Sequence, residues 1–231
     1  MKRLHLLAAL VAPLFISVAH ADEGKHLFIL SGQSNMAGLN PKVSFTPAVE
    51  KAFGANMVIV IKSAKSGQPI RRWCKEWKPA KGRAVSGNFK PGDLYDKMMG
   101  LVKPAIKDQK IASVTLVWMQ GERDAREQHG EVYAESFSSI IGQLEKDLNR
   151  DDVNFIIGRL SDMDMENKRY PHWTMVREQQ VKIAEASGRG AWVDTDDLPM
   201  KGDKLHYNAE GFKILGQHFA DKAVELVRAY R

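Results

Sequence analysis

The feature of this sequence that most restricts its fold is an alternation of short apolar runs with segments of helical periodicity. Five apolar runs occur, at residues 26–31, 57–61, 112–119, 153–160 and 191–194. Because these runs are continuously apolar rather than alternating with polar residues, they predict strands that are buried on both faces, as in a parallel sheet.

Amphipathic segments separate the apolar runs. Apolar residues recur at helical spacing in four segments, most weakly in the third: 93–107, 132–148, 173–186 and 209–230. Asn208 precedes the last segment and is a suitable N-cap residue. Strands that alternate with helices predict the α/β class, with a three-layer sandwich built on a five-stranded parallel sheet.

The N-terminus has the layout of a secretory signal peptide. Two basic residues precede an apolar run at 6–18, and the tripeptide Ala-His-Ala at 19–21 offers small residues for cleavage. The run is short for a bilayer span, which needs roughly 20 residues, so an uncleaved anchor is the alternative. We predict a signal peptide at 1–21, a single mature domain at 22–231, and a secreted or periplasmic protein without stable membrane insertion.

Composition argues against some classes of function. The net charge of +6 falls to +4 without Lys2 and Arg3, and the other basic residues are scattered among acids. We therefore expect no nucleic acid as a partner, whereas attraction to an anionic polysaccharide stays open. Cys74 is the only cysteine, so no intrachain disulfide can form, and we interpret it as structural.

Ligands of open α/β sheets bind beyond the carboxyl ends of the strands. The first predicted strand ends in SGQSNMAG at 31–38, where small residues flank Ser34. Such a turn exposes the hydroxyl, and its backbone N–H groups point at a developing anion. Met36 stands where the G-x-S-x-G elbow of α/β-hydrolases has its second glycine. Taken alone, the segment fits an ordinary strand-to-helix turn equally well.

A candidate acid–base pair follows the fifth predicted strand. An Asp and a His three apart on a helical turn face the same side, and Asp203 and His206 have this spacing. The carboxylate can then hold the Nδ1–H of the imidazole and leave Nε2 free as a base. The other histidines of the mature chain do not stand in this arrangement and are predicted at the surface or in packing: His26, His129, His172 and His218.

Two more polar segments follow predicted strands. The sequence WMQGERD at 118–124 comes after the third strand and indicates either a site wall or a helix-cap loop with solvated acids. The sequence SAKSGQPI at 63–70 comes after the second strand, where Gly67 could present a backbone N–H to a substrate oxygen. The irregular segment 67–91 follows, and a loop of this length in a compact domain is usually functional.

Together these segments resemble the SGNH/GDSL hydrolase superfamily and, within it, the sialate O-acetylesterase-like domain of carbohydrate esterase family six. The resemblance extends from about Leu27 to Phe219. Five blocks carry it: FILSGQSNMAG, SGQPIRRW, GDLYDKM, VWMQGERDA and DKLHYNAEGF. It implies a flavodoxin-like SGNH hydrolase fold, and neither a metal nor a cofactor.

The resemblance also implies roles for individual residues. Ser34 matches the nucleophile, His206 the general base and Asp203 the residue that orients the base. The oxyanion hole would combine the backbone N–H groups of Ser34 and Gly67 with the side-chain amide of Gln120.

Substrate contacts are predicted from the same blocks. Members of this branch commonly have Q-G-E-S-D, and Arg123 replaces the serine here, which puts the contacts of that loop in doubt. Glu122 and Arg72 are predicted to bind substrate. Arg72 and its neighbour Arg71 could pair with the carboxylate of a sialic or uronic acid, although solvent-facing charges are the favoured interpretation.

The sequence thus predicts a secreted serine esterase that hydrolyses O-acetyl esters of a carbohydrate through a Ser-His-Asp triad and an acetyl-enzyme intermediate. One alternative is an esterase that acts on small or lipid acyl esters. Another is a catalytically silent carbohydrate-binding protein, in which Trp73, Trp77 and Trp173 would stack on sugars. Acetylated xylan, sialic acid, peptidoglycan and uronic polymers are all open as substrates.

Overall fold

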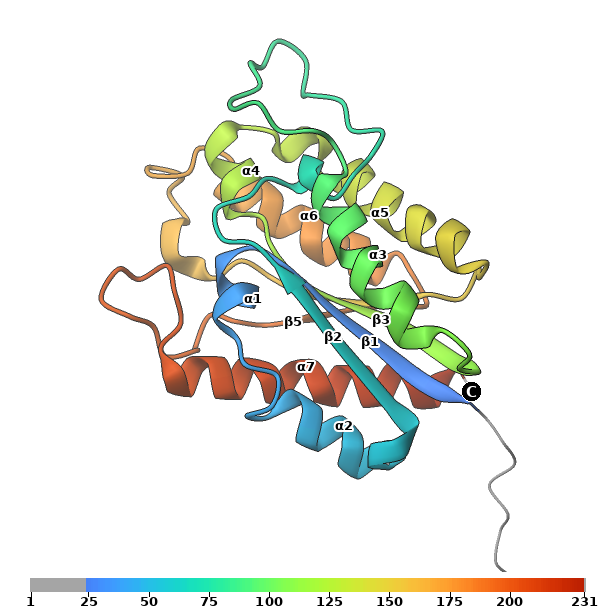
Figure 1. Cartoon of the computed structure of the whole chain (residues 1–231). Coiled ribbons are helices and arrows are strands. Elements are labelled where there is room, and N and C mark those ends of the chain that lie inside the picture. The colour runs from blue at the N-terminus through green and yellow to red at the C-terminus, as the bar shows by residue number, and fades with distance from the viewer. Residues whose placement is uncertain (1–23, 231) are drawn as a thin grey trace, which may run out of the picture.

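The computed structural model describes residues 24–230, and the predicted signal peptide at 1–21 lies outside them. A parallel five-stranded sheet in the order β2-β1-β3-β4-β5 forms the centre of the molecule (Figure 1). The strands are β1 (Lys25–Gly32), β2 (Val58–Ala64), β3 (Ile111–Met119), β4 (Asn154–Gly158) and β5 (Gly190–Val193). The predicted α/β class and five-stranded parallel sheet are confirmed, and the strand order is flavodoxin-like.

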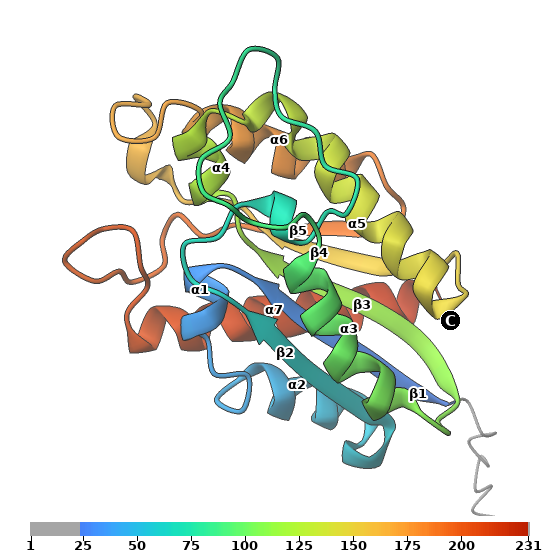
Figure 2. The same ribbon diagram turned by 45° about the horizontal axis from the view of Figure 1, so that its top comes forward.

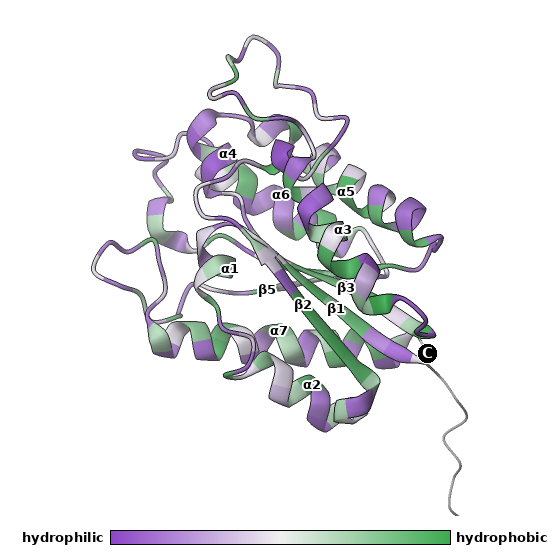
Figure 3. Cartoon of the chain, in the orientation of Figure 1, coloured by the Kyte–Doolittle hydropathy of each residue, from purple (hydrophilic) through white to green (hydrophobic). Residues whose placement is uncertain are grey.

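Helices cover both faces of the sheet and complete three layers, which Figures 1 and 2 show from two directions. One face carries α2 (Phe45–Phe53) and α7 (Ala209–Ala229). The other carries α3 (Asp93–Ile106), α5 (Tyr133–Leu148) and α6 (Trp173–Glu185). Figure 3 shows apolar residues along the strands and polar residues on the outer helix faces and loops.

The continuous apolar character of the strands follows from this arrangement. In β1, Leu27 and Ile29 pack into the core under α3 and α5, whereas Phe28 and Leu30 pack into the core under α2 and α7. All four side chains are fully buried. A strand whose two faces both meet helices cannot alternate between apolar and polar residues.

The four predicted helices are all present, with bounds within about one residue of those expected. Asn208 caps α7 as predicted, because its Oδ1 accepts the N–H of Gly211 at 3.0 Å. Helix α2 and two short helices, α1 (Ser34–Gly38) and α4 (Glu122–Glu127), were not predicted. In the described part of the chain, 3-10 turns lie at Ala55–Met57, Ile70–Arg72, Gly130–Val132 and Asp162–Asp164. No helix among residues 24–230 is long and apolar enough to cross a membrane.

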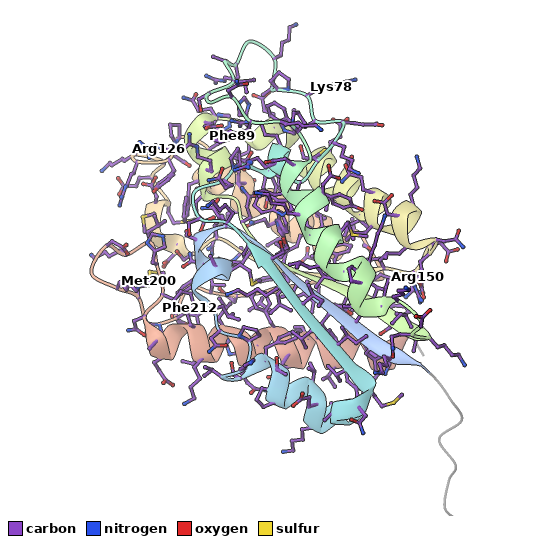
Figure 4. All side chains as sticks on the ribbon, in the orientation of Figure 1. Lys78, Phe89, Arg126, Arg150, Met200 and Phe212 are labelled. Atoms are coloured by element: carbon purple, nitrogen blue, oxygen red, sulfur yellow. The ribbon has the colours of Figure 1, made fainter. Side chains whose placement is uncertain are left out.

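The long loop between β2 and α3 is fastened to the domain by arginines. Arg71 is 1% exposed, and its Nη1 donates to Glu127 at 2.6 Å. The guanidinium of Arg72 lies 4.7 Å from the ring centre of Phe89, while Lys78 projects outward from the same loop (Figure 4). The interpretation of Arg71 as a solvent-facing charge is therefore wrong, because its guanidinium is buried with a carboxylate partner.

Candidate active site

The turn at residues 32–34, which carries the predicted nucleophile Ser34 and is called the nucleophile turn, begins where β1 passes very close to β3. Gly32 has a φ of +142°, and a Cβ there would lie 2.0 Å from the carbonyl oxygen of Met119. Only glycine fits such an approach. The next N–H, of Gln33, donates to the same Met119 oxygen at 2.8 Å. This contact ends the strand and sets Ser34 at the first position of α1, at the carboxyl edge of the sheet.

Ser34, His206 and Asp203 lie in one hydrogen-bonded line. His206 Nδ1 is 2.6 Å from Asp203 Oδ2, and His206 Nε2 is 3.0 Å from Ser34 Oγ. A carboxylate can only accept, so the imidazole proton belongs on Nδ1, and Nε2 is left to accept the serine hydroxyl. The structure therefore brings together three side chains up to 172 residues apart in the sequence. This arrangement can remove a proton from a serine hydroxyl.

Asp203 is oriented by its own loop. Its Oδ1 accepts the backbone N–H groups of Leu205 and His206, both at 3.0 Å. The hydrogen bond with the His206 imidazole, followed by these two backbone bonds, holds the pKa of the Asp203 carboxyl well below its ordinary value. The prediction of a helical turn is wrong, because residues 203–206 form a non-helical turn before α7. Met200, labelled in Figure 4, forms an antiparallel bridge with Tyr207 that closes this loop.

The Gly67 turn follows β2 beside the nucleophile turn. Gly67 is exposed and has a φ of +70°, and no atom lies within 4 Å of the position a Cβ would take. The N–H of Lys65 donates to the carbonyl oxygen of Gly32 at 3.0 Å, which joins this turn to the end of β1. The turn is therefore held next to the segment that carries Ser34.

Gln120 is buried and connects several segments. Its Nε2 lies 2.5 Å from Asp124 Oδ2, 3.1 Å from the carbonyl oxygen of Gln68 and 3.3 Å from Gln33 Oε1. An amide nitrogen has two hydrogens, so these three acceptors already engage both of them. As a third oxyanion donor, Gln120 would have to exchange a protein acceptor for the substrate oxygen.

Glu122 is buried beneath the nucleophile turn rather than open to a substrate. It is 2% exposed, and its Oε1 accepts the Nδ2–H of Asn35 at 3.2 Å. Burial raises the pKa of the Glu122 carboxyl. The predicted substrate contact is therefore revised, because the carboxyl faces another protein side chain inside the molecule.

Arg72 is also committed to protein partners. Its guanidinium pairs with both carboxylate oxygens of Asp93, and its Nη1 donates to Gln68 Oε1 at 2.8 Å. Its predicted role in substrate binding is revised accordingly, because Asp93 occupies the place of a substrate carboxylate. Arg123 lies closer to solvent and pairs with Glu127 at 2.5 Å.

Asp124 and Asn35 were not predicted as site residues. Asp124 is fully buried, and its Oδ2 accepts the N–H of Ile70 at 2.9 Å as well as the Gln120 amide. Burial raises the pKa of Asp124 to about 7. The sequence signals for these residues are their places in polar segments directly after strands and in two of the blocks that carry the resemblance.

Two of the three tryptophans proposed to stack on sugars are not accessible. Trp73 and Trp173 are both buried, and Trp77 packs its ring edge-on to His129 at 5.2 Å. The structure gives the silent carbohydrate-binding alternative no aromatic platform from Trp73 or Trp173. Among residues 24–230, no group of three or more His, Cys, Asp or Glu side chains could hold a metal ion.

Comparison with known proteins gives consistent results. A family model described as carbohydrate esterase, sialic acid-specific acetylesterase, matches residues 37–225. A probable carbohydrate esterase of Arabidopsis thaliana is 26% identical over 206 residues, which are 87% of this chain and 68% of that protein.

Solved structures share the fold. An Arabidopsis thaliana protein superposes with a TM-score of 0.69 at 21% identity, covering 87% of this chain and 98% of that one. A carbohydrate acetylesterase from Xanthomonas citri superposes with a TM-score of 0.63 at 16% identity, covering 88% of this chain. The present chain spans only 57% of that longer protein.

Proposed function

The chain belongs to the carbohydrate esterase family of sialic acid-specific acetylesterases, and from this premise we propose that it removes O-acetyl groups from a carbohydrate with a Ser34–His206–Asp203 triad. As a member of that family it is a carboxylic ester hydrolase. The observation that carries the proposed mechanism is the line of contacts from Asp203 through His206 to Ser34, at 2.6 and 3.0 Å.

The proposed reaction proceeds in two acyl transfers. His206 Nε2 takes the hydroxyl proton as Ser34 Oγ bonds to the acetyl carbonyl carbon, and the imidazolium that forms is stabilised by Asp203. The ester C–O bond then breaks, and His206 returns the proton to the leaving sugar oxygen. Water, deprotonated by His206, attacks the acetyl-enzyme and releases acetate and the free Ser34 hydroxyl.

The oxyanion of each tetrahedral intermediate needs preorganised donors. We assign the backbone N–H groups of Ser34 and Gly67 to this role, because both residues lie in turns at the carboxyl edge of the sheet. Gln120 is the third candidate, provided that it releases one of its protein acceptors. Loss of one such donor typically raises the barrier by about 3–4 kcal/mol.

We also propose that the protein acts outside the cytoplasm, after cleavage of the segment at 1–21. The basis is the leader-like pattern of that segment, with its basic start, apolar run and Ala-His-Ala. N-terminal sequencing of the protein recovered from its native compartment tests this proposal. A mature chain that begins at Asp22 is the expected result, and an intact N-terminus would contradict it.

The direct test of the activity compares the wild type with Ser34→Ala. We expect the wild type to release 4-nitrophenol from its acetate and to release acetate from at least one member of a panel of acetylated glycans. The Ser34→Ala variant should lose both activities by at least about 10³-fold, because it lacks the hydroxyl oxygen on which the acetyl-enzyme forms. Full retention of activity would exclude Ser34 as the nucleophile.

The same panel separates the proposal from an esterase of small or lipid acyl esters. Deacetylation of a glycan at a kcat/KM well above that for 4-nitrophenyl butyrate or hexanoate supports a carbohydrate substrate. The reverse order would favour the alternative. The glycan that reacts fastest would also identify the sugar.

A further inference from the structure

Behind the triad, one side chain joins the nucleophile turn to the loop that carries the base. Asn35 directly follows Ser34 and is 2% exposed. Its Nδ2 donates to the carbonyl oxygen of Leu205 at 3.1 Å, and its Oδ1 accepts the N–H of Tyr207 at 3.3 Å. Leu205 and Tyr207 are the two neighbours of His206. The Asn35 carboxamide therefore holds the backbone on both sides of the base, while its own backbone continues from Ser34.

Glu122 helps to fix the orientation of this carboxamide. The Nδ2 group of Asn35 also donates to Glu122 Oε1 at 3.2 Å. If the amide turned over, its oxygen would face both the Glu122 carboxyl and the Leu205 carbonyl, and the Tyr207 N–H would lose its acceptor. Glu122 therefore reinforces the orientation that the Leu205 carbonyl and the Tyr207 N–H also require, and it anchors the amide from inside the domain.

We propose that Glu122 is a positioning residue, which acts through Asn35 to keep His206 at the distance from Ser34 that proton transfer requires. The inference rests on the proposed Ser34–His206 chemistry. Its physical basis is that the loop at 201–206 is mostly exposed, and that the Asn35 carboxamide lies inside the domain and bonds both residues that flank the base. A displacement of about 1 Å in a reacting group can reduce the rate about 100-fold.

Two substitutions of Glu122 test this role. Glu122→Ala removes one of the two acceptors of the Asn35 amide and lets the carboxamide shift, so we expect kcat for 4-nitrophenyl acetate to fall about 10- to 100-fold with KM within about twofold. Glu122→Gln keeps a carbonyl oxygen for Asn35, so it should restore kcat to within about threefold of the wild type. The rate at which a fluorophosphonate probe labels Ser34 should change in parallel with kcat.

Asn35→Ala removes the other partner of the Asn35–Glu122 hydrogen bond. It provides the test if Glu122→Ala does not fold. Because both residues act through one hydrogen bond, the double variant should be no slower than the slower single variant. Tyr95→Phe is the matched control. Tyr95 lies in α3, and its hydroxyl donates to Asp147 in α5 at 3.0 Å. The substitution removes this hydrogen bond from a largely buried side chain, so it should lower Tm without changing kcat.

The outcomes separate this role from its rivals. An increase in KM at unchanged kcat in Glu122→Ala would mean that Glu122 contacts substrate, as the sequence suggested. Equal losses in the Ala and Gln variants, or an unchanged kcat in folded Glu122→Ala, would overturn the positioning role. If the wild type itself is not labelled by the probe, the proposed mechanism fails and the positioning role fails with it. If the wild type and Glu122→Ala are labelled equally fast, only the positioning role fails.

Discussion

Asp203 and Asp124 are two carboxyl groups of the same site in opposite surroundings. The Asp203 side chain is 44% exposed, and its contacts with backbone N–H groups and His206 hold its pKa well below the ordinary value. Asp124 is fully buried and accepts the Gln120 amide and the Ile70 N–H. Burial is the largest influence on its pKa and raises it to about 7.

The difference in exposure and pKa distinguishes a carboxyl group proposed to take part in the reaction from one that positions other residues of the site. In the proposed mechanism Asp203 must be charged, because it orients a neutral imidazole and stabilises the imidazolium. Asp124 has to supply only an acceptor oxygen, which a neutral carboxylic acid also has. The exposed turns at Gly67 and at 203–206 carry the predicted chemistry, and the buried polar groups beneath them fix their positions. We therefore expect the charge of Asp203 to control the rate and the charge of Asp124 to control stability.

The largest effect should come from Asp203→Asn. The Asp203 Oδ1 accepts two backbone N–H groups, so the asparagine oxygen should take that place and turn its NH₂ toward His206 Nδ1. The imidazole proton would then move to Nε2, where it cannot accept the Ser34 proton. We expect kcat to fall roughly 10³- to 10⁴-fold, as for a triad with the wrong tautomer.

Asp203→Ala is the informative control for this prediction. It leaves the imidazole free to take either tautomer, so it should retain more activity than Asp203→Asn. Steady-state kinetics with 4-nitrophenyl acetate compare the two. If Asp203→Asn is as active as the wild type, the charge of the exposed carboxyl group does not control the rate, and the proposed contrast with Asp124 fails.

The second effect concerns pH and stability. Asp124 keeps its proton up to about pH 7 in the folded state but loses it near pH 4 in the unfolded chain. The folded state therefore binds more protons between these values, and the free energy of unfolding of the wild type should decline as pH rises from about 4 to 7. Asp203 acts in the opposite sense. Because its pKa is lowered in the folded state, the Asp203 carboxylate stabilises the fold above about pH 4, and this stabilisation is lost as the pH falls further.

Asp124→Asn isolates the contribution of the buried carboxyl group. The amide is neutral throughout, so its free energy of unfolding should not fall with pH for this reason. Urea unfolding should therefore show that the difference in free energy of unfolding, variant minus wild type, increases by about 2–4 kcal/mol from pH 5 to pH 8. Far-ultraviolet circular dichroism can follow both proteins. Parallel pH profiles of the two proteins would mean that Asp124 does not titrate between these values.

The same contrast explains what the sequence could predict. The five strands were predictable because burial on both faces leaves continuous apolar runs, and the four longer amphipathic helices because periodicity accumulates over several turns. Helices α1 and α4 have five and six residues, too few for a period to show. Ser34, Asp203 and His206 could be predicted together because each follows a strand, and parallel strands end at one edge.

The partners of charged side chains could not be predicted in this way. Glu122 and Arg72 stand in polar segments, where charges are usually solvated, and both were assigned to substrate. Their partners in the fold are Asn35, 87 residues away, and Asp93, 21 residues away. No local pattern in the sequence indicates such pairs, because they depend on how loops from different strand ends meet.

The smallest effect should come from Gly67→Ala. An alanine at a φ of +70° strains the backbone by about 1–2 kcal/mol, and the empty space around this position means that no other contact has to change. The hydrogen bonds that Gln68 and Ile70 make with Gln120 and Asp124 remain, so the strain should be relieved by rotation of the exposed turn itself. If the Gly67 N–H is an oxyanion donor, kcat should fall about 5- to 30-fold with little change in Tm.

Gly82→Ala provides the matched control, because Gly82 has a φ of +74° with no atom within 4 Å, in the loop between β2 and α3. Both variants carry the same backbone strain in an exposed turn, and only one turn lies next to Ser34. A loss of kcat in Gly67→Ala alone would assign the N–H to the reaction. Equal kinetics in the two variants would mean that the Gly67 N–H does not stabilise the oxyanion. The remaining donors would then be the Ser34 N–H and buried groups, of which the Gln120 amide is the first candidate.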